Sequence, residues 1–172
     1  MRETKHRKII QQFCEYAIEQ VINGSIYLRG AQGERGYNLT DAYIAKREYN
    51  DESNIKRVKK TLERKRKNYR NEYIAAYDCS GLVMYFMLSN GLFTADMTAN
   101  GIKGKTKKLK REEVGEGDFC CHLDSSGKCT HIAIAIDNLN CVEARGRDYG
   151  VVMSEIDDRG FNYYGRLTMW ED

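Results

Sequence analysis

The spacing of apolar residues in the first half of the chain predicts three amphipathic helices. Apolar positions recur every three or four residues over 7–22, and an Asn-Gly pair follows this stretch directly. A threonine and a serine are placed to cap two further helices, over about 40–48 and 53–73. Residues 25–33 are rich in glycine and predict a short extended piece within a loop.

The pattern changes in the second half of the chain. Residues 80–89 are apolar on nearly all sides, which is typical of a buried helix, and 94–116 form a polar connection. After it the apolar period falls to two, which predicts strands at 119–123, 131–136, 141–144, 151–154 and 163–169. Helices followed by a strand meander favour the α+β class. A length of 172 residues suits a single domain spanning 1–172.

Composition narrows the class of protein further. The apolar share of 41% is enough for a packed core, and no apolar run reaches the roughly 18–20 residues of a membrane span. The net charge of +3 conceals an asymmetry, with +8 in residues 1–70 and −5 in 71–172. Nine Lys and Arg lie between positions 56 and 70, on a helix face that either binds a polyanion or is simply solvated.

The amino terminus and the cysteines indicate the compartment of synthesis. Gln11 and Gln12 interrupt the apolar run that a secretory signal needs, so we expect synthesis in the cytoplasm without an export signal. The six cysteines contain no CxxC pair, which favours free thiols. Cysteines and histidines crowd residues 120–131, but their spacing does not match zinc ligand pairs, so no metal site is predicted.

A cysteine at the start of the buried helix is the first candidate for chemistry. Cys79 follows Tyr77-Asp78 and precedes Ser80-Gly81, which places it in the first helical turn. Unpaired backbone N–H groups there favour a thiolate and can hold an oxyanion. The alternative is a small, inert residue buried at a helix start. The position alone does not decide between them.

A histidine that opens a strand is the second candidate. Alternation turns the isoleucines of this strand toward the core and leaves His131 on the opposite face, beside two alanines. Such a histidine is a candidate base only with a partner cysteine. Glu143 shares its face only if the connecting loop has an odd number of residues, such as 137–139 or 138–140. Asparagines in this loop can adopt left-handed conformations, which favours a bulged three-residue turn.

Together these motifs resemble the NlpC-type cell-wall peptidases, papain-like cysteine endopeptidases that cut the stem peptides of peptidoglycan. The resemblance rests on Tyr-Asp-Cys-Ser-Gly-Leu-Val from Tyr77, Gly-Asp-Phe from Gly117, the strand from His131, and Val-Glu-Ala-Arg from Val142. The segment 26–30 resembles the family's Tyr-x-x-Gly loop. The match covers about 8–33 and 77–168, so 37–76 is expected to be a helical insertion ahead of the nucleophile.

The resemblance implies a papain-like fold, with the nucleophile helix packed on an antiparallel sheet, and a Cys-His-Glu mechanism. Cys79 takes the place of the nucleophile, His131 that of the general base and Glu143 that of the orienting residue. The family more often has His, Asn or Gln in the third place, so Glu143 is a departure. A carboxylate can still hold the imidazole and stabilise imidazolium. The expected substrate-binding residues are Tyr27, Asp78, Ser80 and Arg145, and no cofactor is implied.

The implied substrate is a peptidoglycan stem peptide, cut between D-isoglutamate and the diamino acid. Without an export signal, such an enzyme would reach the bacterial wall by phage delivery or another export route. The basic helix at 53–73 is a candidate surface for anionic wall polymers, and nucleic acid is not the expected partner.

Three alternatives remain open. One is an N-acetylmuramoyl-L-alanine amidase or an acyltransferase on the same fold. The second is a binding module that grips nucleic acid through the basic helix. The third is a catalytically silent family member in a phage or mobile-element particle.

Overall fold

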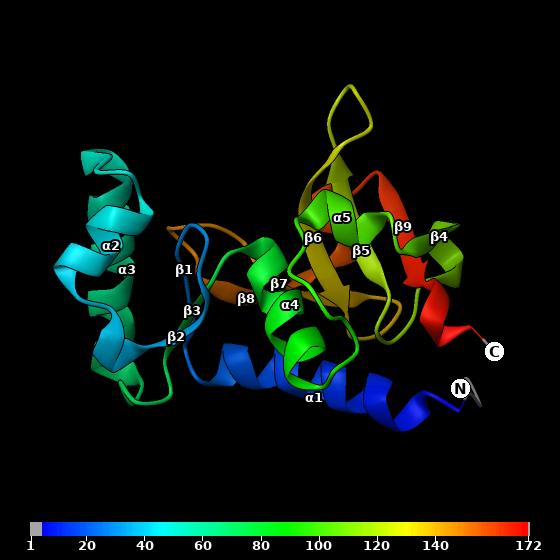
Figure 1. Cartoon of the computed structure of the whole chain (residues 1–172), viewed down its shortest axis with the longest axis horizontal. Coiled ribbons are helices and arrows are strands. Elements are labelled where there is room, and N and C mark those ends of the chain that lie inside the picture. The colour runs from blue at the N-terminus through cyan, green and yellow to red at the C-terminus, as the bar shows by residue number, and fades with distance from the viewer. Residues whose placement is uncertain (1–4, 172) are drawn as a thin grey trace.

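A six-stranded sheet in the order β4-β9-β5-β6-β7-β8 organises the computed structural model, which describes residues 5–171 (Figure 1). The charged residues before position 5 lie outside this range. Neighbouring strands in the sheet are antiparallel. The strands are β4 (Thr106–Leu109), β5 (Phe119–Leu123), β6 (Cys129–Ala135), β7 (Asn140–Ala144), β8 (Val151–Glu155) and β9 (Tyr163–Leu167). The α+β class is therefore confirmed, and the predicted meander holds for β5 to β8, whereas β9 returns to pair with β5.

The helices agree with the predicted pattern at their centres and differ at some ends. They are α1 (Arg7–Ile22), α2 (Asp41–Arg47), α3 (Glu52–Asn68), α4 (Cys79–Ser89) and α5 (Ala99–Lys103). The carboxylate of Asp51, not a serine, caps α3 by accepting from the backbone N–H of Asn54 at 2.8 Å. The predicted end at 73 was wrong, because the backbone becomes extended at Tyr69 and leads into β3.

A second, three-stranded sheet lies beside the first turn of α4. It consists of β1 (Ile26–Tyr27), β2 (Gln32–Arg35) and β3 (Ala75–Tyr77), in the order β1-β3-β2. Strand β1 runs parallel to β3, with Tyr27 opposite Tyr77. This pairing brings Tyr27 next to the residues that open α4.

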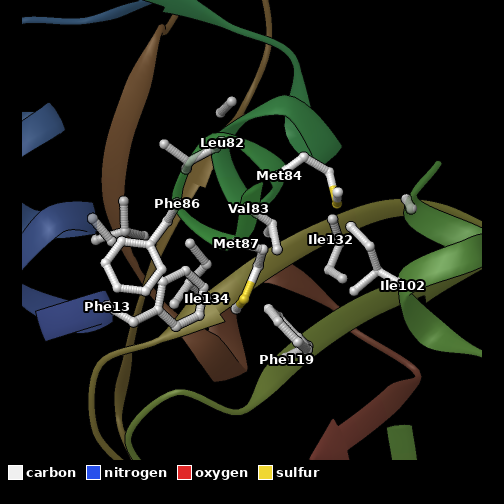
Figure 2. Packing of buried hydrophobic residues seen from close by; sticks show 14 of the residues in the cluster. Phe13, Leu82, Val83, Met84, Phe86, Met87, Ile102, Phe119, Ile132 and Ile134 are labelled. Atoms are coloured by element: carbon white, nitrogen blue, oxygen red, sulfur yellow. The ribbon is translucent and has the colours of Figure 1, made fainter. Parts of the chain in front are cut away.

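Helix α4 forms the centre of the main hydrophobic core. Figure 2 shows its apolar side chains packed against Phe13 of α1, Phe119 of β5 and two isoleucines of β6. Four of these side chains are at most 1% exposed: Leu82, Val83, Met84 and Met87. Each such burial contributes roughly 1.5–3 kcal/mol to stability. The core therefore holds the amino-terminal turn of α4 in a defined place against the sheet.

The alternation predicted for the strand of His131 is also confirmed. Ile132 and Ile134 lie in the main core, whereas Ala133 and Ala135 lie in a smaller cluster on the other face of the sheet. That cluster includes Phe161, which follows β8 in the chain. The sheet is consequently buried on both faces around β6.

Helices α2 and α3 have a hydrophobic core of their own, separate from that of α4. Figure 1 shows the two helices side by side at the end of the molecule away from the six-stranded sheet. Their core joins Ile44, Val58 and Leu62 to Ile26 and Leu28 of the segment that carries β1. Helices α2 and α3 thus pack on the residues around Tyr27. That residues 37–76 are an insertion stays a prediction.

The connection 94–116 is more ordered than its polar sequence indicated. It contains α5 and the edge strand β4, which pairs with β9. Lys107 and Lys108 of β4 are exposed, so the strand lacks the alternation that identifies a half-buried strand. Charged residues of this kind protect a sheet edge from further pairing.

Gly81→Ala should destabilise the fold at the start of α4. A Cβ on Gly81 would lie 2.1 Å from the carbonyl oxygen of Ala31, so the loop after β1 would have to move. We expect a loss of about 1–3 kcal/mol in the free energy of unfolding, measured by urea denaturation. Gly115→Ala is the matched control, because its nearest neighbour would be 4.0 Å away. Equal stability of the two variants would contradict this account.

Candidate active site

Asp78 joins the first turn of α4 to the loop that follows β1. Its Oδ1 accepts from the backbone N–H of Gly81 at 2.6 Å and from the Ser80 hydroxyl at 3.2 Å. Its Oδ2 accepts from the backbone N–H of Gly30 at 3.1 Å. Burial raises the pKa of the Asp78 carboxyl. The predicted substrate-binding residues Asp78 and Ser80 are therefore hydrogen-bonded to each other at the helix start.

Cys79 is the first residue of α4 and is half-buried, whereas the other five cysteines are buried. Burial, followed by the nearby Asp78 carboxylate, raises the pKa of the Cys79 thiol to about 11, although the N–H groups of Ile132 and Ser80 oppose this. At this position loss of hydration opposes the effect of the helix start, which by itself favours a thiolate. A thiolate at this position requires a base.

The hairpin of β6 and β7 has the odd loop that a shared face requires. Ile134 pairs with Val142, and the N–H of Ile136 donates to the carbonyl of Asn140 at 2.9 Å, which leaves a loop of 137–139. Glu143 is therefore a diagonal neighbour of His131 on one face, as predicted.

The predicted left-handed asparagines in this loop were wrong. Within residues 5–171 the non-glycine residues with positive φ are Tyr49 and Asn50. Instead, Oδ1 of Asp137 accepts from the backbone N–H groups of Leu139 and Asn140, each at 2.7 Å. The Asp137 carboxylate thus closes the turn without positive φ.

His131 and Glu143 form a hydrogen bond of 2.8 Å between Nε2 and Oε1. The carboxylate can only accept, so the Nε2–H donates, and in the neutral ring Nδ1 is the acceptor. A β-bulge precedes His131: His122 lies opposite His131 but Leu123 opposite Cys129, which leaves Thr130 unpaired. Such a bulge redirects the neighbouring side chain at the end of a strand.

Arg159 is the residue of this network that sequence reasoning missed. It ends a short 3-10 helix, Ile156–Arg159, and binds both oxygens of Glu143 at 2.8 Å. Glu143 is fully buried. Burial alone would raise the pKa of Glu143, but the hydrogen bonds from His131 and Arg159 lower it to about 2. Nothing in the sequence pattern marks Arg159, which lies in a polar turn between two strands.

Aromatic rings enclose the network from one side. Nε2 of His122 lies 2.7 Å from the backbone carbonyl of Arg159, and the ring stacks on Phe161 with 4.6 Å between centroids. The rings of His122 and His131 are 5.5 Å apart. His122 therefore connects β5 to the turn that supplies Arg159.

Tyr27 lies close to Cys79, as the resemblance implied. Burial, followed by the charges of Cys79 and Asp78, raises the pKa of Tyr27 to about 12. The guanidinium of Arg147 lies 5.4 Å from the Tyr27 ring. Arg145 instead stacks on Tyr149 at 4.4 Å and has no described contact with Tyr27. The structure thus brings Tyr27, Asp78, Cys79 and Ser80 together, whereas the described side-chain contact of Arg145 is with Tyr149.

Within residues 5–171, the Cys79 thiol and the His131 imidazole share no direct hydrogen bond, and the thiol reaches the strand of His131 through the backbone. The Cys79 thiol lies at the backbone N–H of Ile132, the residue after His131. In residues 5–171, no His, Cys, Asp and Glu side chains cluster in threes as a metal site would require. Over the same range, no helix is long and apolar enough to cross a bilayer.

The chain matches the sequence model of one known protein family. The sequence model of the NlpC/P60 family matches residues 65–167, which is more than half of the chain. This chain belongs to the NlpC/P60 family. The resemblance found in the sequence is therefore confirmed. A comparison with curated proteins gives no match.

Solved structures of NlpC/P60 proteins share the fold. NlpC1 from Trichomonas vaginalis is 13% identical over 96% of this chain, which spans only 45% of that protein, with a TM-score of 0.60. The peptidoglycan hydrolase RipB from Mycobacterium tuberculosis is 17% identical (94% of this chain, 67% of RipB, TM-score 0.52). RipD from the same organism is described as non-catalytic and adapted to peptidoglycan binding. It is 14% identical over 91% of this chain and 98% of RipD, with a TM-score of 0.54. At these identities the likeness shows the papain-like fold alone.

The ionised Glu143 should stabilise the protein at neutral pH and lose this effect in acid. Its pKa is lowered to about 2 in the folded state, so the stabilisation is complete above the unfolded pKa and disappears as pH falls toward 2. The shift corresponds to about 3 kcal/mol. The difference in free energy of unfolding between wild type and Glu143→Gln should therefore shrink by that amount between pH 6 and pH 2, measured by denaturant titration. A pH-independent difference would contradict the assignment.

Proposed function

We propose that this chain is a cysteine endopeptidase that hydrolyses an amide bond in the stem peptide of bacterial peptidoglycan. Cys79 is the nucleophile, His131 the general base and Glu143 the residue that orients the imidazole. The proposal is supported by one arrangement above all: a buried carboxylate that holds Nε2 of His131 at 2.8 Å, with the half-buried Cys79 beside the same strand.

The first chemical step follows from the hydrogen bond of the imidazole. Because Nε2 donates to Glu143, Nδ1 is the nitrogen that accepts the proton of the Cys79 thiol. The thiol and Nδ1 tighten into a hydrogen bond when substrate binds, since catalytic contacts in a free enzyme are often longer than in the complex. The imidazolium that forms lies against a carboxylate that stays ionised, because Arg159 holds it.

The thiolate then attacks the amide carbonyl carbon, and the oxyanion is held by backbone N–H groups of Cys79 and Ser80 at the start of α4. The imidazolium returns its proton to the leaving amine as the C–N bond breaks, which leaves a thioester on Cys79. Water, deprotonated by His131, attacks the thioester carbonyl carbon. The C–S bond breaks and releases the carboxylic acid and the thiol.

The substrate class comes from family membership. RipB, with the same fold, is described as a peptidoglycan hydrolase, and the proposed bond joins D-isoglutamate to the diamino acid. Tyr27, Asp78 and Ser80 lie beside Cys79 and are the proposed substrate contacts. Arg145 stays a predicted contact for an acidic group of the peptide. Delivery to the wall by a phage or by another export route is likewise a prediction.

Cys79→Ala should abolish hydrolysis and leave folding intact, because it removes the nucleophile with a small change of volume. Mass spectrometry of products released from purified peptidoglycan, and from a soluble muropeptide, is the measurement. The mass of the products also separates endopeptidase from amidase activity. Thermal unfolding of the variant is the control. Activity that survives in Cys79→Ala would overturn the cysteine mechanism.

Substitutions of the other two proposed catalytic residues, His131 and Glu143, should lower kcat by less than Cys79→Ala, and in a defined order. His131→Ala should lower kcat nearly as far as Cys79→Ala, because members of one catalytic unit fail together. Glu143→Gln should be milder than Glu143→Ala, since the amide oxygen can still accept from Nε2. Full turnover by Glu143→Ala would assign the third place to another residue.

A wall-binding protein without hydrolytic activity is the second candidate. The raised pKa of the Cys79 thiol and the lack of a described hydrogen bond to His131 favour it, and RipD is a non-catalytic protein with this fold. Under this alternative, wild type and Cys79→Ala would bind purified walls equally and neither would release a product.

The basic helix is a weaker candidate for wall attachment than its nine cations indicated. Several of them have partners within the fold: Arg57 pairs with Asp148, Lys59 with Asp41, and Arg66 donates to the carbonyl of Gly36. Lys65 is partly buried against Tyr69. The exposed cations of α3 with no ion pair or hydrogen bond in the described range are Lys56, Lys60 and Lys67. These three form the surface that we propose for anionic wall polymers.

Changing Lys56, Lys60 and Lys67 together to Gln should weaken binding to intact walls and reduce its salt dependence, because exposed charges act through screened contacts. Cosedimentation with purified walls across a salt series measures this. Cleavage of a small soluble muropeptide should be unchanged, which separates attachment from chemistry. Equal wall binding by the variant and wild type would leave α3 as a purely structural helix.

A further inference from the structure

The carboxylate of Glu48, at the carboxyl end of α2, is fully buried and joins three segments of the chain. Its Oε2 accepts from Nε and Nη2 of Arg147 at 2.9 and 2.7 Å. Its Oε1 accepts from the backbone N–H of Arg29 at 3.1 Å. Arg147 belongs to the loop between β7 and β8, and Arg29 is the second residue after β1. Glu48 therefore links α2 to the residues just after β1 and to the β7–β8 loop, the two parts of the chain next to Tyr27.

Side chains of helix α3 bind the same loop between β7 and β8, both at the backbone carbonyls of the loop and at the carboxylate of Asp148. The hydroxyl of Thr61 donates to the carbonyl of Arg147 at 2.6 Å, and Arg64 donates to the carbonyl of Asp148 at 3.1 Å. Arg57 binds both carboxylate oxygens of Asp148 at 2.9 Å. The loop is thus fixed at its side chains and at its backbone, which leaves little freedom for the Arg147 guanidinium.

A strained turn sets the position of Glu48. The two residues after it, Tyr49 and Asn50, have φ of 52° and 58°. A tyrosine in this conformation is uncommon and costs free energy. The Tyr49 ring lies under the Arg29 guanidinium at 4.5 Å. The strained backbone of the α2–α3 turn thus lies where the turn contacts Arg29, two residues after Tyr27.

We propose that the Glu48–Arg147 ion pair positions Tyr27 beside Cys79 for substrate binding. The guanidinium of Arg147 lies 5.4 Å from the Tyr27 ring, and Cys79 and Asp78 are close enough to Tyr27 to act on its hydroxyl electrostatically. The helical segment of α2 and α3 therefore builds one wall of the substrate site. This inference rests on the proposed function, because it assigns Tyr27 to the binding of the stem peptide.

The Glu48→Gln/Arg147→Met double variant tests the proposal. It removes both charges together, because loss of one partner would leave the other buried and unpaired, which is strongly destabilising. We expect KM for a soluble muropeptide to rise about tenfold while kcat stays within about twofold, since the reacting groups are unchanged. Lys107→Gln, which breaks the exposed pair with Glu171, is the control and should leave KM unchanged.

Tyr27→Phe separates positioning from general destabilisation. If the ion pair acts through Tyr27, adding the double variant to Tyr27→Phe should raise KM by less than about twofold, because the positioned hydroxyl is already absent. Independent effects that multiply, or an unchanged KM in the double variant with native thermal stability, would overturn the proposal.

Calorimetric binding of the muropeptide in the Cys79→Ala background gives the same comparison without turnover. Wild type that binds but does not cleave would contradict the proposed hydrolysis and still test the ion pair. A muropeptide that neither binds nor is cleaved would overturn both.

Discussion

The buried carboxylate of Glu143 imposes the strictest physical requirement on this structure. It has lost its water completely, so its charge persists only because His131 and Arg159 bind it at 2.8 Å. Meeting that requirement fixes the register of the β6–β7 hairpin, since the imidazole must share a face with the carboxylate. It also fixes the turn after β8, because Arg159 must reach the same oxygens. The sheet, the turn and the orientation of the imidazole follow from one charge.

A fully buried carboxylate paired with an arginine occurs at two other places in the described residues. Glu48 binds Arg147, and Asp118 binds Arg166 at 2.9 and 2.7 Å, and both carboxylates are fully buried. Buried pairs gain little net stability, because removing both ions from water costs about as much as their attraction returns. Their effect is to bring residues far apart in sequence into one geometry. Here two of the three pairs lie next to Cys79, His131 or Tyr27, where geometry matters most for the proposed reaction.

The environment of Cys79 shows how two local effects compete. The start of α4 supplies backbone N–H groups, but burial and the Asp78 carboxylate have the larger effect and raise the pKa of the Cys79 thiol to about 11. Asp78 has a structural role as well, since its carboxylate caps α4 and accepts a hydrogen bond from the loop after β1. The proposed enzyme therefore depends on His131 to generate the nucleophile during turnover, whereas a protein that only binds walls would have no such need.

The amino-acid sequence by itself determined the features that local pattern controls. Apolar spacing identified α1 and the buried α4, and the motif around Cys79 led to the NlpC/P60 family. Period-two alternation even required an odd hairpin loop if His131 and Glu143 share a face. Only the tertiary structure decided which distant residues meet. Arg159 and Glu48 carry no local signal, β4 is a strand only because β9 lies beside it, and Arg147 rather than Arg145 lies against Tyr27. Periodicity records which side of an element is buried, whereas the partners of a buried charge depend on how whole elements pack.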